Sequence, residues 1–587
     1  MSQKILSTAV LILICGGSAM AQFGRGGGQW ATAGGDPQRT GWVRADPQIS
    51  KENVTKGVVQ FLWKTKLDNA PRQLEALTPP AVIGRVISYK GFKDLMFISG
   101  SSDKIWSIDH PLGKIFWESK LPYSATYPQQ TGGTPGCPGG LTSPMAVASG
   151  PPPSPFGPLP PAPAGTTAAT PGATPGAAPA TPPAQADGGR GGRGGRGGRG
   201  GRGGDVAAAT PAAGTPGTAG APAAAAPPPA GRGFGGPRLP AAVYALSSDG
   251  LIHTINQHSG DDFAPGFKFI RPNSLARGLA VVDNIAYVAT TGNCGGTPNG
   301  IWAMDLSPTV SVKELSTVKW LSGNANIEGS AGFTFGAPGT IYAATGDGPH
   351  DPASGEFGKA IVALDQKTLK LKDWFTPSGD VTFRTAPVFF NFKEKDYLAV
   401  ADAQGRLYVL DAAAPGGADH KTPLFVTPPI APVAAGKGIH NALASWQDAD
   451  GTRWILAPFA GALSAEAKTG GIAAFKMVEQ AGKISLQQGW TSRDLTSPAA
   501  PIIVNGVVFA LSTGENTAVA PEQRAARSTP AVLYALDGAS GKEMWSSAKT
   551  ITGFSHSGGL ASGASKVFVS THDGNLYAFG YLLSREP

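Results

Sequence analysis

Charged residues and cysteine are both scarce in this sequence. Asp, Glu, Lys and Arg make up 15% of the 587 residues, and three cysteines are present, none in a C-x-x-C or C-x-x-C-H motif. The absence of both motifs argues against a redox-active dithiol and against covalently attached haem. The sequence also has no nucleophile motif, zinc-ligand spacing or phosphate-binding loop. It therefore gives no sign of hydrolytic, zinc-dependent or nucleotide-dependent catalysis.

Long apolar runs are missing as well, apart from one at the N-terminus. Lys4 precedes an apolar stretch over residues 5–15, and Ala19-Met20-Ala21 forms a small-residue cleavage site before Gln22. The stretch is too short to span a bilayer and has the flanks of a secretory signal peptide. We therefore expect residues 1–21 to direct export to the periplasm or the extracellular space, and we expect no membrane span.

Two cysteines remain beyond this leader. Cys137 and Cys294 lie in Gly/Pro-rich stretches, TPGCPGG and TGNCGGTP. Because exported proteins fold in an oxidising compartment, two cysteines in similar loops predict one disulfide, Cys137–Cys294. Two unrelated thiols are the alternative.

The net charge of +8 comes largely from one low-complexity segment. Residues 149–238 are rich in Pro, Ala, Thr and Gly, include an RGG tract, and hold seven arginines against two aspartates. Such a composition cannot bury a core and predicts a disordered insertion between residues 22–148 and 239–587. The rest of the mature chain is close to neutral, so we expect no nucleic-acid partner. Weak attachment of the RGG tract to an anionic cell-surface polymer is the alternative to a merely solvated loop.

A repeated pair of strands decides the fold class. Each copy is an apolar, β-branched or aromatic run, a polar turn and a second alternating run, and four copies are complete: residues 96–109, 243–256, 397–411 and 567–580. Four more copies keep the second strand, at residues 301–305, 361–365, 471–476 and 533–537. Their ends are spaced 43 to 65 residues apart, except across the low-complexity segment. Strand-only units at this period are typical of propeller blades.

An aromatic strand follows most copies, but the last copy has too little chain left for one. The sequence FLWKTKL at residues 61–67 has the same character and lies near the N-terminus. We therefore expect an all-β, eight-bladed β-propeller in which this N-terminal strand closes the last blade, since closure removes open sheet edges.

Two motifs carry a resemblance to a known family. The sequence LYALDGASGKEMW at residues 533–545 resembles the pyrroloquinoline quinone (PQQ) repeat, and WATAGGDPQRTGW at residues 30–42 resembles the start of quinoprotein-type propellers. The resemblance to the quinoprotein alcohol dehydrogenase-like superfamily covers residues 30–148 and 239–580. It implies the propeller fold, whereas the repeat reports blade packing and not activity.

In such propellers the innermost strand of each blade begins near the mouth of the central channel. Counting back from each hairpin places mostly small hydroxyl residues there; the exceptions are Arg277, Arg384, His440, Asn441 and His556. Two arginines and two histidines around one funnel predict an electropositive pocket for carboxylates or phosphates, PQQ being a tricarboxylate. The alternative is that these side chains pair with local acids or carbonyls and join the blades.

A second candidate set lies in loops between blades. The segment TTGNCGG at residues 290–296 resembles the Gly-Thr-Gly-Asn segment whose Asn binds calcium in quinoprotein alcohol dehydrogenases, which implies a ligand role for Asn293. The segment ATGDGPHD adds Asp347 and Asp351, whose oxygens suit Ca²⁺. Ordinary turn residues are the alternative interpretation.

Two functions remain open at this stage. The first is an exported, monomeric propeller that binds a small anionic ligand or an envelope protein partner, similar in build to the outer-membrane assembly propeller. The second is a PQQ- and Ca²⁺-dependent dehydrogenase of alcohols or sugars. Quinoprotein alcohol dehydrogenases typically carry two adjacent cysteines over the quinone, and this sequence has no Cys-Cys pair. That absence favours the first function and leaves open whether the chain is an enzyme.

Overall fold

The computed structural model describes residues 30–88, 91–122, 136–149, 242–307, 315–336, 338–431, 436–556 and 559–581. The expected signal peptide and all of the expected insertion beyond Ser149 up to residue 238 lie outside these residues. The chain divides into a larger unit, residues 1–162 and 237–587, and a smaller one, residues 163–236. Every described residue belongs to the larger unit.

The regular secondary structure of the described residues is almost entirely β-strand. Five sheets have four strands each: β3 (Ala81–Ser88), β4 (Gly91–Ser99), β5 (Lys104–Asp109) and β6 (Lys114–Lys120); β15 (Phe333–Gly336), β16 (Thr340–Ala344), β19 (Ile361–Asp365) and β20 (Leu371–Phe375); β21 (Val388–Phe392), β22 (Lys395–Ala401), β23 (Leu407–Asp411) and β24 (Phe425–Val426); β25 (Ala444–Gln447), β26 (Arg453–Ala460), β27 (Gly470–Gln480) and β28 (Lys483–Thr491); and β2 (Gln60–Lys66), β35 (Asn575–Gly580), β34 (Lys566–Ser570) and β33 (Leu560–Gly563).

Three further sheets differ in size. The five-stranded sheet comprises β1 (Trp42–Val43), β29 (Ile502–Val504), β30 (Val507–Ser512), β31 (Val532–Asp537) and β32 (Glu543–Ser546). The eight-stranded sheet comprises β10 (Phe267–Lys268), β9 (Leu251–Asn256), β8 (Ala242–Leu246), β7 (Ala146–Ser149), β11 (Leu275–Val282), β12 (Ile285–Thr291), β13 (Gly300–Asp305) and β14 (Thr317–Leu321). A small pair joins β17 (His350–Asp351) and β18 (Glu356–Phe357).

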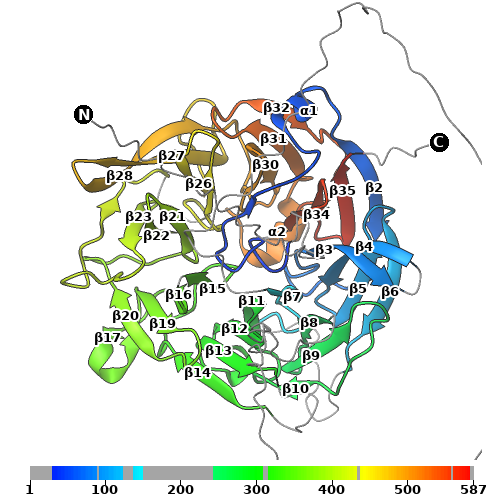
Figure 1. Cartoon of the computed structure of the whole chain (residues 1–587), viewed down its shortest axis with the longest axis horizontal. Coiled ribbons are helices and arrows are strands. Elements are labelled where there is room, and N and C mark those ends of the chain that lie inside the picture. Colours follow the sequence, from blue (N-terminus) through cyan, green and yellow to red (C-terminus); the bar gives the residue numbers. More distant parts are fainter. Residues whose placement is uncertain are drawn as a thin grey trace, which may run out of the picture. The chain divides into compact units, whose positions relative to one another are not determined.

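Helical segments in the described residues are short: α1 (Lys51–Thr55), α2 (Pro521–Arg527) and the 3₁₀ turns η1 (Cys294–Gly296) and η2 (Pro352–Ser354). None of the helices described is long and apolar enough to cross a membrane. The sheets of the larger unit surround a common centre, and α2 lies near that centre (Figure 1).

The four complete repeats form the predicted hairpins. Residues 243–256, for example, become β8 and β9, and Gly250 in their turn has φ of +82°. Gly574 has φ of +76° in the turn between β34 and β35. Glycine accepts this left-handed conformation without the steric cost that a Cβ adds, which explains the Asp-Gly pairs that marked both turns.

The eight-stranded sheet is the main difference from a plain series of four-stranded sheets. Its two halves join where β7 and β11 pair in parallel, through Ala148 with Val281 and Ser149 with Val282. Both strands are the first of their four-strand group and run in the same direction. Innermost strands converge toward the axis, and β7 and β11 lie close enough there to form parallel hydrogen bonds.

The predicted N-terminal outer strand is present and pairs with the last strand of the chain. In β2, Phe61 lies opposite Phe579 of β35 in an antiparallel ladder, although the two segments are more than 500 residues apart. Trp63 of β2 also donates its indole N–H to the carbonyl of His110, 2.9 Å away, just beyond β5. The strand thus contacts sheets from both ends of the sequence.

Residues 30–46, which we name the axial segment, cross the centre and bind one innermost strand after another (Figure 1). Backbone hydrogen bonds join, in order, Trp30 to Val82, Ala31 to Val147, Pro37 to Phe335, Gln38 to Phe389, Thr40 to Ser445 and Gly41 to Ile503. The side chains of Thr32 and Asp46 add contacts to Leu279 and Ser565. This segment therefore joins the sheets at the axis.

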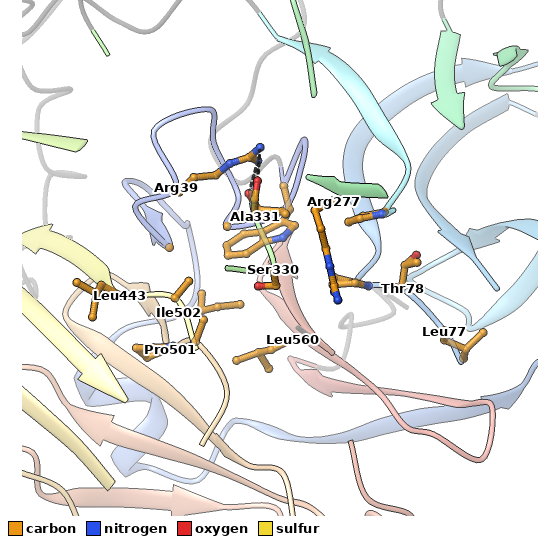
Figure 2. A pocket seen from close by; sticks show the side chains of 18 of the residues that line it. Arg39, Leu77, Thr78, Arg277, Ser330, Ala331, Leu443, Pro501, Ile502 and Leu560 are labelled. Atoms are coloured by element: carbon orange, nitrogen blue, oxygen red, sulfur yellow. Dashed lines mark hydrogen bonds between the residues drawn. The ribbon is translucent and has the colours of Figure 1, made fainter. Parts of the chain in front are cut away.

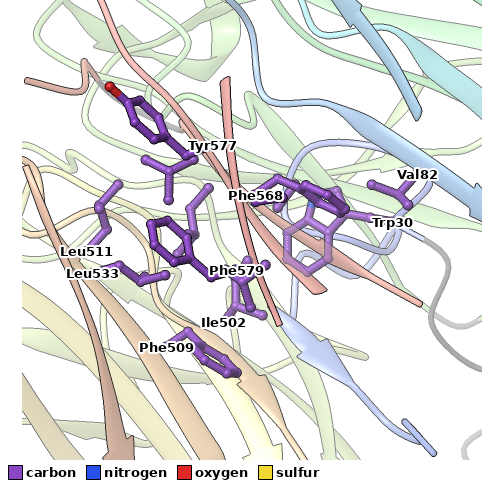
Figure 3. Packing of buried hydrophobic residues seen from close by; sticks show 14 of the residues in the cluster. Trp30, Val82, Ile502, Phe509, Leu511, Leu533, Phe568, Tyr577 and Phe579 are labelled. Carbon is purple, nitrogen blue, oxygen red and sulfur yellow. The ribbon is translucent and has the colours of Figure 1, made fainter. Parts of the chain in front are cut away.

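Apolar side chains of neighbouring sheets form the core. The largest cluster joins β3–β5, β29–β31 and β33–β35 to residues of the N-terminal segment. Figure 3 shows Trp30 beside Val82 and Phe568, with Phe509 and Phe579 in the same cluster. Trp30 is 3% exposed. The aromatic residue that opened the quinoprotein-like motif is thus a core residue at the axis.

Candidate functional site

The five residues predicted at the channel mouth do come together around one cavity. Its volume is about 1000 Å³, and its walls include all of them: Arg277, Arg384, His440, Asn441 and His556. Arg277 lies in β11, and the other four lie in the chain just before β21, β25 or β33. Innermost strands start at this end of the propeller, which is why residues far apart in sequence share one wall.

Arg277 and Arg384 each face an acid without forming a close pair. Arg277 Nη1 lies 3.8 Å from Glu75 Oε1, and Arg384 lies 3.8 Å from Glu328 Oε1 and 3.7 Å from Asp347 Oδ2. These separations are longer than hydrogen bonds. The side chains are 24% and 37% exposed. Both guanidinium groups therefore keep hydrogen-bonding capacity directed at the cavity.

His556 is committed to an internal ion pair. Its Nδ1 lies 3.0 Å from Glu515 Oε2, and Arg524 of α2 lies 3.1 Å from the other oxygen of the same carboxylate. Burial opposes a charged imidazole, but the hydrogen bond and charge of Glu515 outweigh it and raise the pKa of His556. Burial likewise opposes ionisation of Glu515, and its two partners lower its pKa. The contacts of His556 therefore fit the alternative interpretation, in which these side chains pair with local acids.

His440 and Asn441 also make local contacts. His440 Nε2 lies 2.6 Å from the carbonyl of Lys437, which makes this nitrogen the donor, and Asn441 donates to the carbonyl of Pro498 at 2.7 Å. Loss of hydration, followed by the charges of Arg384 and Arg524, lowers the pKa of His440. The lowered pKa means that His440 carries less positive charge near pH 7 than a free imidazole would.

Sequence reasoning missed two charged groups on the same wall, Glu328 and Lys437. Burial raises the pKa of Glu328 to about 7, against the opposing charge of Arg384. The sequence could have indicated Glu328, because this residue directly precedes Gly329, the first residue of a segment expected at the channel mouth. The wall thus carries Arg277, Arg384 and Lys437 together with Glu328, while Glu75 and Asp347 lie beside the two arginines.

A smaller chamber of about 70 Å³ lies next to the large cavity, and Arg277 and Ser330 line both. Most of its wall is apolar, and Figure 2 shows Arg277 and Ser330 among the side chains of Leu77, Leu443 and Leu560. Trp30 also lines the chamber, and its buried Nε1 has no hydrogen-bond partner among the described residues.

The expected calcium ligands each have contacts of their own. Asn293 precedes η1 with φ of +50°, and its backbone N–H donates to the side chain of Asn299. Asp347 accepts from Thr382 and faces Arg384, while Asp351 caps η2 by accepting from the N–H of Ala353. Neither Asn293 nor Asp351 lines the two cavities. In the described part of the chain, no three His, Cys, Asp or Glu residues cluster to hold a metal.

The predicted disulfide is present at the rim of the large cavity. It joins Cys137 to Cys294 with their Cα atoms 5.4 Å apart, and Cys137 is part of the cavity wall. It links the chain just before β7 to the η1 turn after β12. The bond therefore holds two loops of the eight-stranded sheet together beside Arg277.

Comparisons with known proteins support the fold and go no further. No family model matches the sequence, and no curated protein matches it. Solved structures do match. The quinohemoprotein alcohol dehydrogenase of Comamonas testosteroni has a TM-score of 0.52 at 15% identity, over 95% of this chain and 81% of that chain. The quinohemoprotein alcohol dehydrogenase ADHIIG of Pseudomonas putida HK5 has 0.51 at 12%, over 94% and 80%.

A third solved structure, BamB of Moraxella catarrhalis, matches with a TM-score of 0.43 at 11% identity, over 89% of this chain and 100% of that chain. The two alcohol dehydrogenases, taken with the sheets around one axis, define the class of the protein as an all-β propeller. More particularly, its fold is similar to that of the two quinohemoprotein alcohol dehydrogenases.

Proposed function

We propose that this chain is an exported β-propeller that binds a small ligand carrying carboxylates at the mouth of its central channel. The observation that carries the proposal is the pair Arg277 and Arg384 on one cavity wall, with acid partners 3.7 to 3.8 Å away. Guanidinium groups form forked hydrogen bonds to carboxylates, and here the described residues leave those donors unused. A concave site of this size suits a small molecule better than a protein surface.

Citrate is a suitable probe because it presents several carboxylates. We expect it to raise the thermal unfolding midpoint of the chain and to show saturable binding in isothermal titration calorimetry at low ionic strength. The double variant Arg277→Ala/Arg384→Ala should lose at least tenfold in affinity. Arg493→Ala is the matched control, because Arg493 pairs with Glu543 away from the cavity. Equal citrate binding by the double variant and the wild type would show that the arginines serve structure only.

A PQQ-dependent dehydrogenase is the second candidate, and the shared fold favours it. The two arginines fit the carboxylates of PQQ. The described residues bring no three His, Cys, Asp or Glu side chains together, so they offer no carboxylate cluster for Ca²⁺. No Trp, Tyr or Phe is among the described residues that line the large cavity, so none is there to stack on a planar quinone. We therefore rank this function second and assign no catalytic residue.

The enzyme candidate has a direct test. The purified chain is incubated with PQQ and Ca²⁺, followed by absorbance spectroscopy, a thermal shift assay and dye-linked oxidation of alcohols or sugars. A bound quinone spectrum together with turnover would establish the dehydrogenase. Absence of both spectrum and shift would exclude it and leave ligand binding as the function.

Three finer points of organisation belong to the same proposal. We count eight blades, taking the eight-stranded sheet as two blades that meet at β7 and β11. We take β2 as the strand that closes the last blade, supported by its ladder with β35. Export is supported by the leader at residues 1–21 and by the disulfide, since disulfides persist in oxidising compartments.

A further inference from the structure

His110, which directly follows β5, is a buried titratable residue outside the candidate site. The residue is 0% exposed, and neither nitrogen of its ring has a hydrogen-bond partner among the described residues. Nearly all buried polar atoms in native structures have such a partner, because a buried atom without one has lost its hydrogen bonds to water. An uncharged imidazole tolerates this better than a charged one, since burying an unpaired charge costs far more free energy. The setting therefore disfavours the protonated form of His110.

His110 lies where the sheet of β3–β6 meets the sheet of β33–β35. Its carbonyl accepts the indole N–H of Trp63 in β2 at 2.9 Å, and its own N–H donates to the carbonyl of Asp94 in β4 at 3.1 Å. Its ring lies edge-on to the ring of Phe568 in β34, with 5.5 Å between the two centroids. We name the contacts between β2 and residues 110–113 the β2 junction.

A buried lysine makes the surroundings of His110 positive. Lys566, the first residue of β34, is 5% exposed and donates to the carbonyl of Ala564 at 3.1 Å. Burial, followed by the charge of Lys566, lowers the pKa of His110 well below its usual range. Proton uptake would place two N–H donors without acceptors beside a second cation, so the structure opposes it on both counts.

The other charged side chains on the segments packed here give the imidazole no acid partner. They are Lys93 and Asp94 on β4, Asp109 on β5, Asp46 of the axial segment, and Lys64 and Lys66 on β2. Asp109 pairs with Lys93 at 2.7 Å. Burial lowers the pKa of Lys566, and the charges of Asp94 and Asp46 offset part of that effect. These acids are thus matched by lysines, and none of the described acids hydrogen-bonds the ring.

Acid should weaken any packing that keeps His110 buried. A histidine in an unfolded chain has a pKa of about 6.5, so it binds a proton more readily than folded His110 does. The stability that this difference contributes is fully present above about pH 6.5 and is lost as the pH falls below it. The loss amounts to about tenfold in the opening equilibrium per pH unit, down to the lowered pKa of the folded state. The same rule holds for a local opening that exposes His110 to water.

We propose that the β2 junction is acid-sensitive: protonation of His110 places an unpaired charge between the two sheets and releases β2 from residues 110–113. β2 is the end strand of its sheet and has a ladder, with β35, on one side. End strands separate at a lower free-energy cost than strands paired on both sides. Acid therefore loosens β2 before the rest of the described structure opens. This inference goes beyond the proposed function, since it involves neither cavity.

Hydrogen exchange of the full chain, followed by mass spectrometry at about pH 7.5 and about pH 5.5, tests this inference. Exchange rates of residues 60–66 are compared with those of an unstructured peptide at the same pH, which gives protection factors that are comparable between the two conditions. Wild-type β2 should lose about tenfold in protection at the lower pH, which is about one unit below the pKa of an unfolded histidine. β22, which belongs to another sheet, should keep its protection.

Two variants assign the effect to one residue. His110→Phe removes the titrating group and keeps an aromatic ring at this place, so its β2 should have the same protection at both pH values. If this variant does not fold, His110→Met replaces it. His420→Phe is the matched control, because it removes a histidine that stacks on Trp374 of another sheet. The control should keep the full loss of protection in β2.

Several results would overturn the inference. Equal protection of wild-type β2 at the two pH values would do so, and so would a loss that persists in His110→Phe or His110→Met. An equal loss in β22 would show that acid unfolds the whole chain rather than opening the β2 junction, and would also overturn it. These results are independent of the anion site, because the experiment contains no ligand for it.

Discussion

Single residues decide the electrostatics of this site more than the overall charge of the chain does. Arg277 and Arg384 keep acid partners at 3.7 to 3.8 Å, whereas His556 and Glu515 form a close pair at 3.0 Å. The first arrangement leaves donors for a ligand and the second satisfies its own members. The residues predicted at the channel mouth thus differ: the two arginines keep free donors, whereas His556 is held in an internal ion pair.

At the proposed anion site, Glu328 should make the affinity for an anion depend on pH. Burial raises its pKa from 4.5 to about 7, so the group gains a negative charge as the pH rises through 7. Below that pH it is neutral and the wall is more positive, so oxalate, which stays fully ionised in this range, should bind several-fold more tightly at about pH 6 than at about pH 8. Glu328→Gln should show a smaller change in affinity between these two conditions, and the remaining change comes from His556, which lines the same cavity and has a raised pKa. Calorimetry at the two pH values checks this, and an unchanged pH profile in the variant would contradict it.

At the scale of elements, the axial segment is the feature with the largest structural consequence. It is irregular apart from the two residues of β1, yet it bonds to innermost strands of sheet after sheet. Its buried Arg39 donates to the carbonyls of Phe333 at 2.9 Å and Gly278 at 3.0 Å. Burial lowers the pKa of Arg39 to about 10, so it remains charged near pH 7.

Replacing Arg39 should therefore destabilise the whole propeller. Arg39→Met leaves buried carbonyls unpaired on two strands, and each such group costs about 1 to 3 kcal/mol. We expect a clear fall in the thermal unfolding midpoint, measured by circular dichroism. Arg44→Met in the same segment is the control, because Arg44 is exposed and stacks on Trp42 at the surface. Equal midpoints for the two variants would show that the axial segment does not join the sheets energetically.

At the scale of the whole molecule, the pairing of the N-terminal strand β2 with the C-terminal strand β35 joins the two ends of the propeller sequence. Trp63 of β2 packs on Phe568 of β34 and also bonds the chain beyond β5, so one side chain touches the first and last sheets. As the proposed closing strand of the last blade, β2 would cover the edge of β35, which could otherwise pair with other chains.

Trp63→Ala should weaken this closure. Truncating a packed tryptophan costs about 3 to 5 kcal/mol when it is fully buried, and Trp63 is half-buried, so we expect a smaller loss. Hydrogen exchange followed by mass spectrometry should show faster exchange in β35 and β5. Phe61→Ala, on the same strand but 43% exposed, should have a weaker effect. Unchanged exchange in both end sheets of Trp63→Ala would contradict the closing role of β2.

The strand pattern made much of the fold predictable. Hairpins such as β8–β9 follow from alternating apolar residues around Asp249-Gly250, and the outer strand β2 follows from the aromatic run at residues 61–67. The merging of two four-strand groups through β7 and β11 was not predictable, because it depends on how close two innermost strands approach in space. The role of Trp30 as part of a chamber wall likewise has no local signal.

By itself, the sequence determined the strand-turn-strand repeat, the Cys137–Cys294 disulfide and which side chains depart from the small residues at the channel mouth, because periodicity and turn chemistry are local properties. Only the tertiary structure decided which of those side chains serve the cavity. Arg277 and Arg384 keep their acid partners beyond hydrogen-bonding distance, loss of hydration lowers the pKa of His440, and neither Asn293 nor Asp351 lines a cavity. Pairing, hydration and distance between blades depend on how distant segments meet, and no local pattern encodes that meeting.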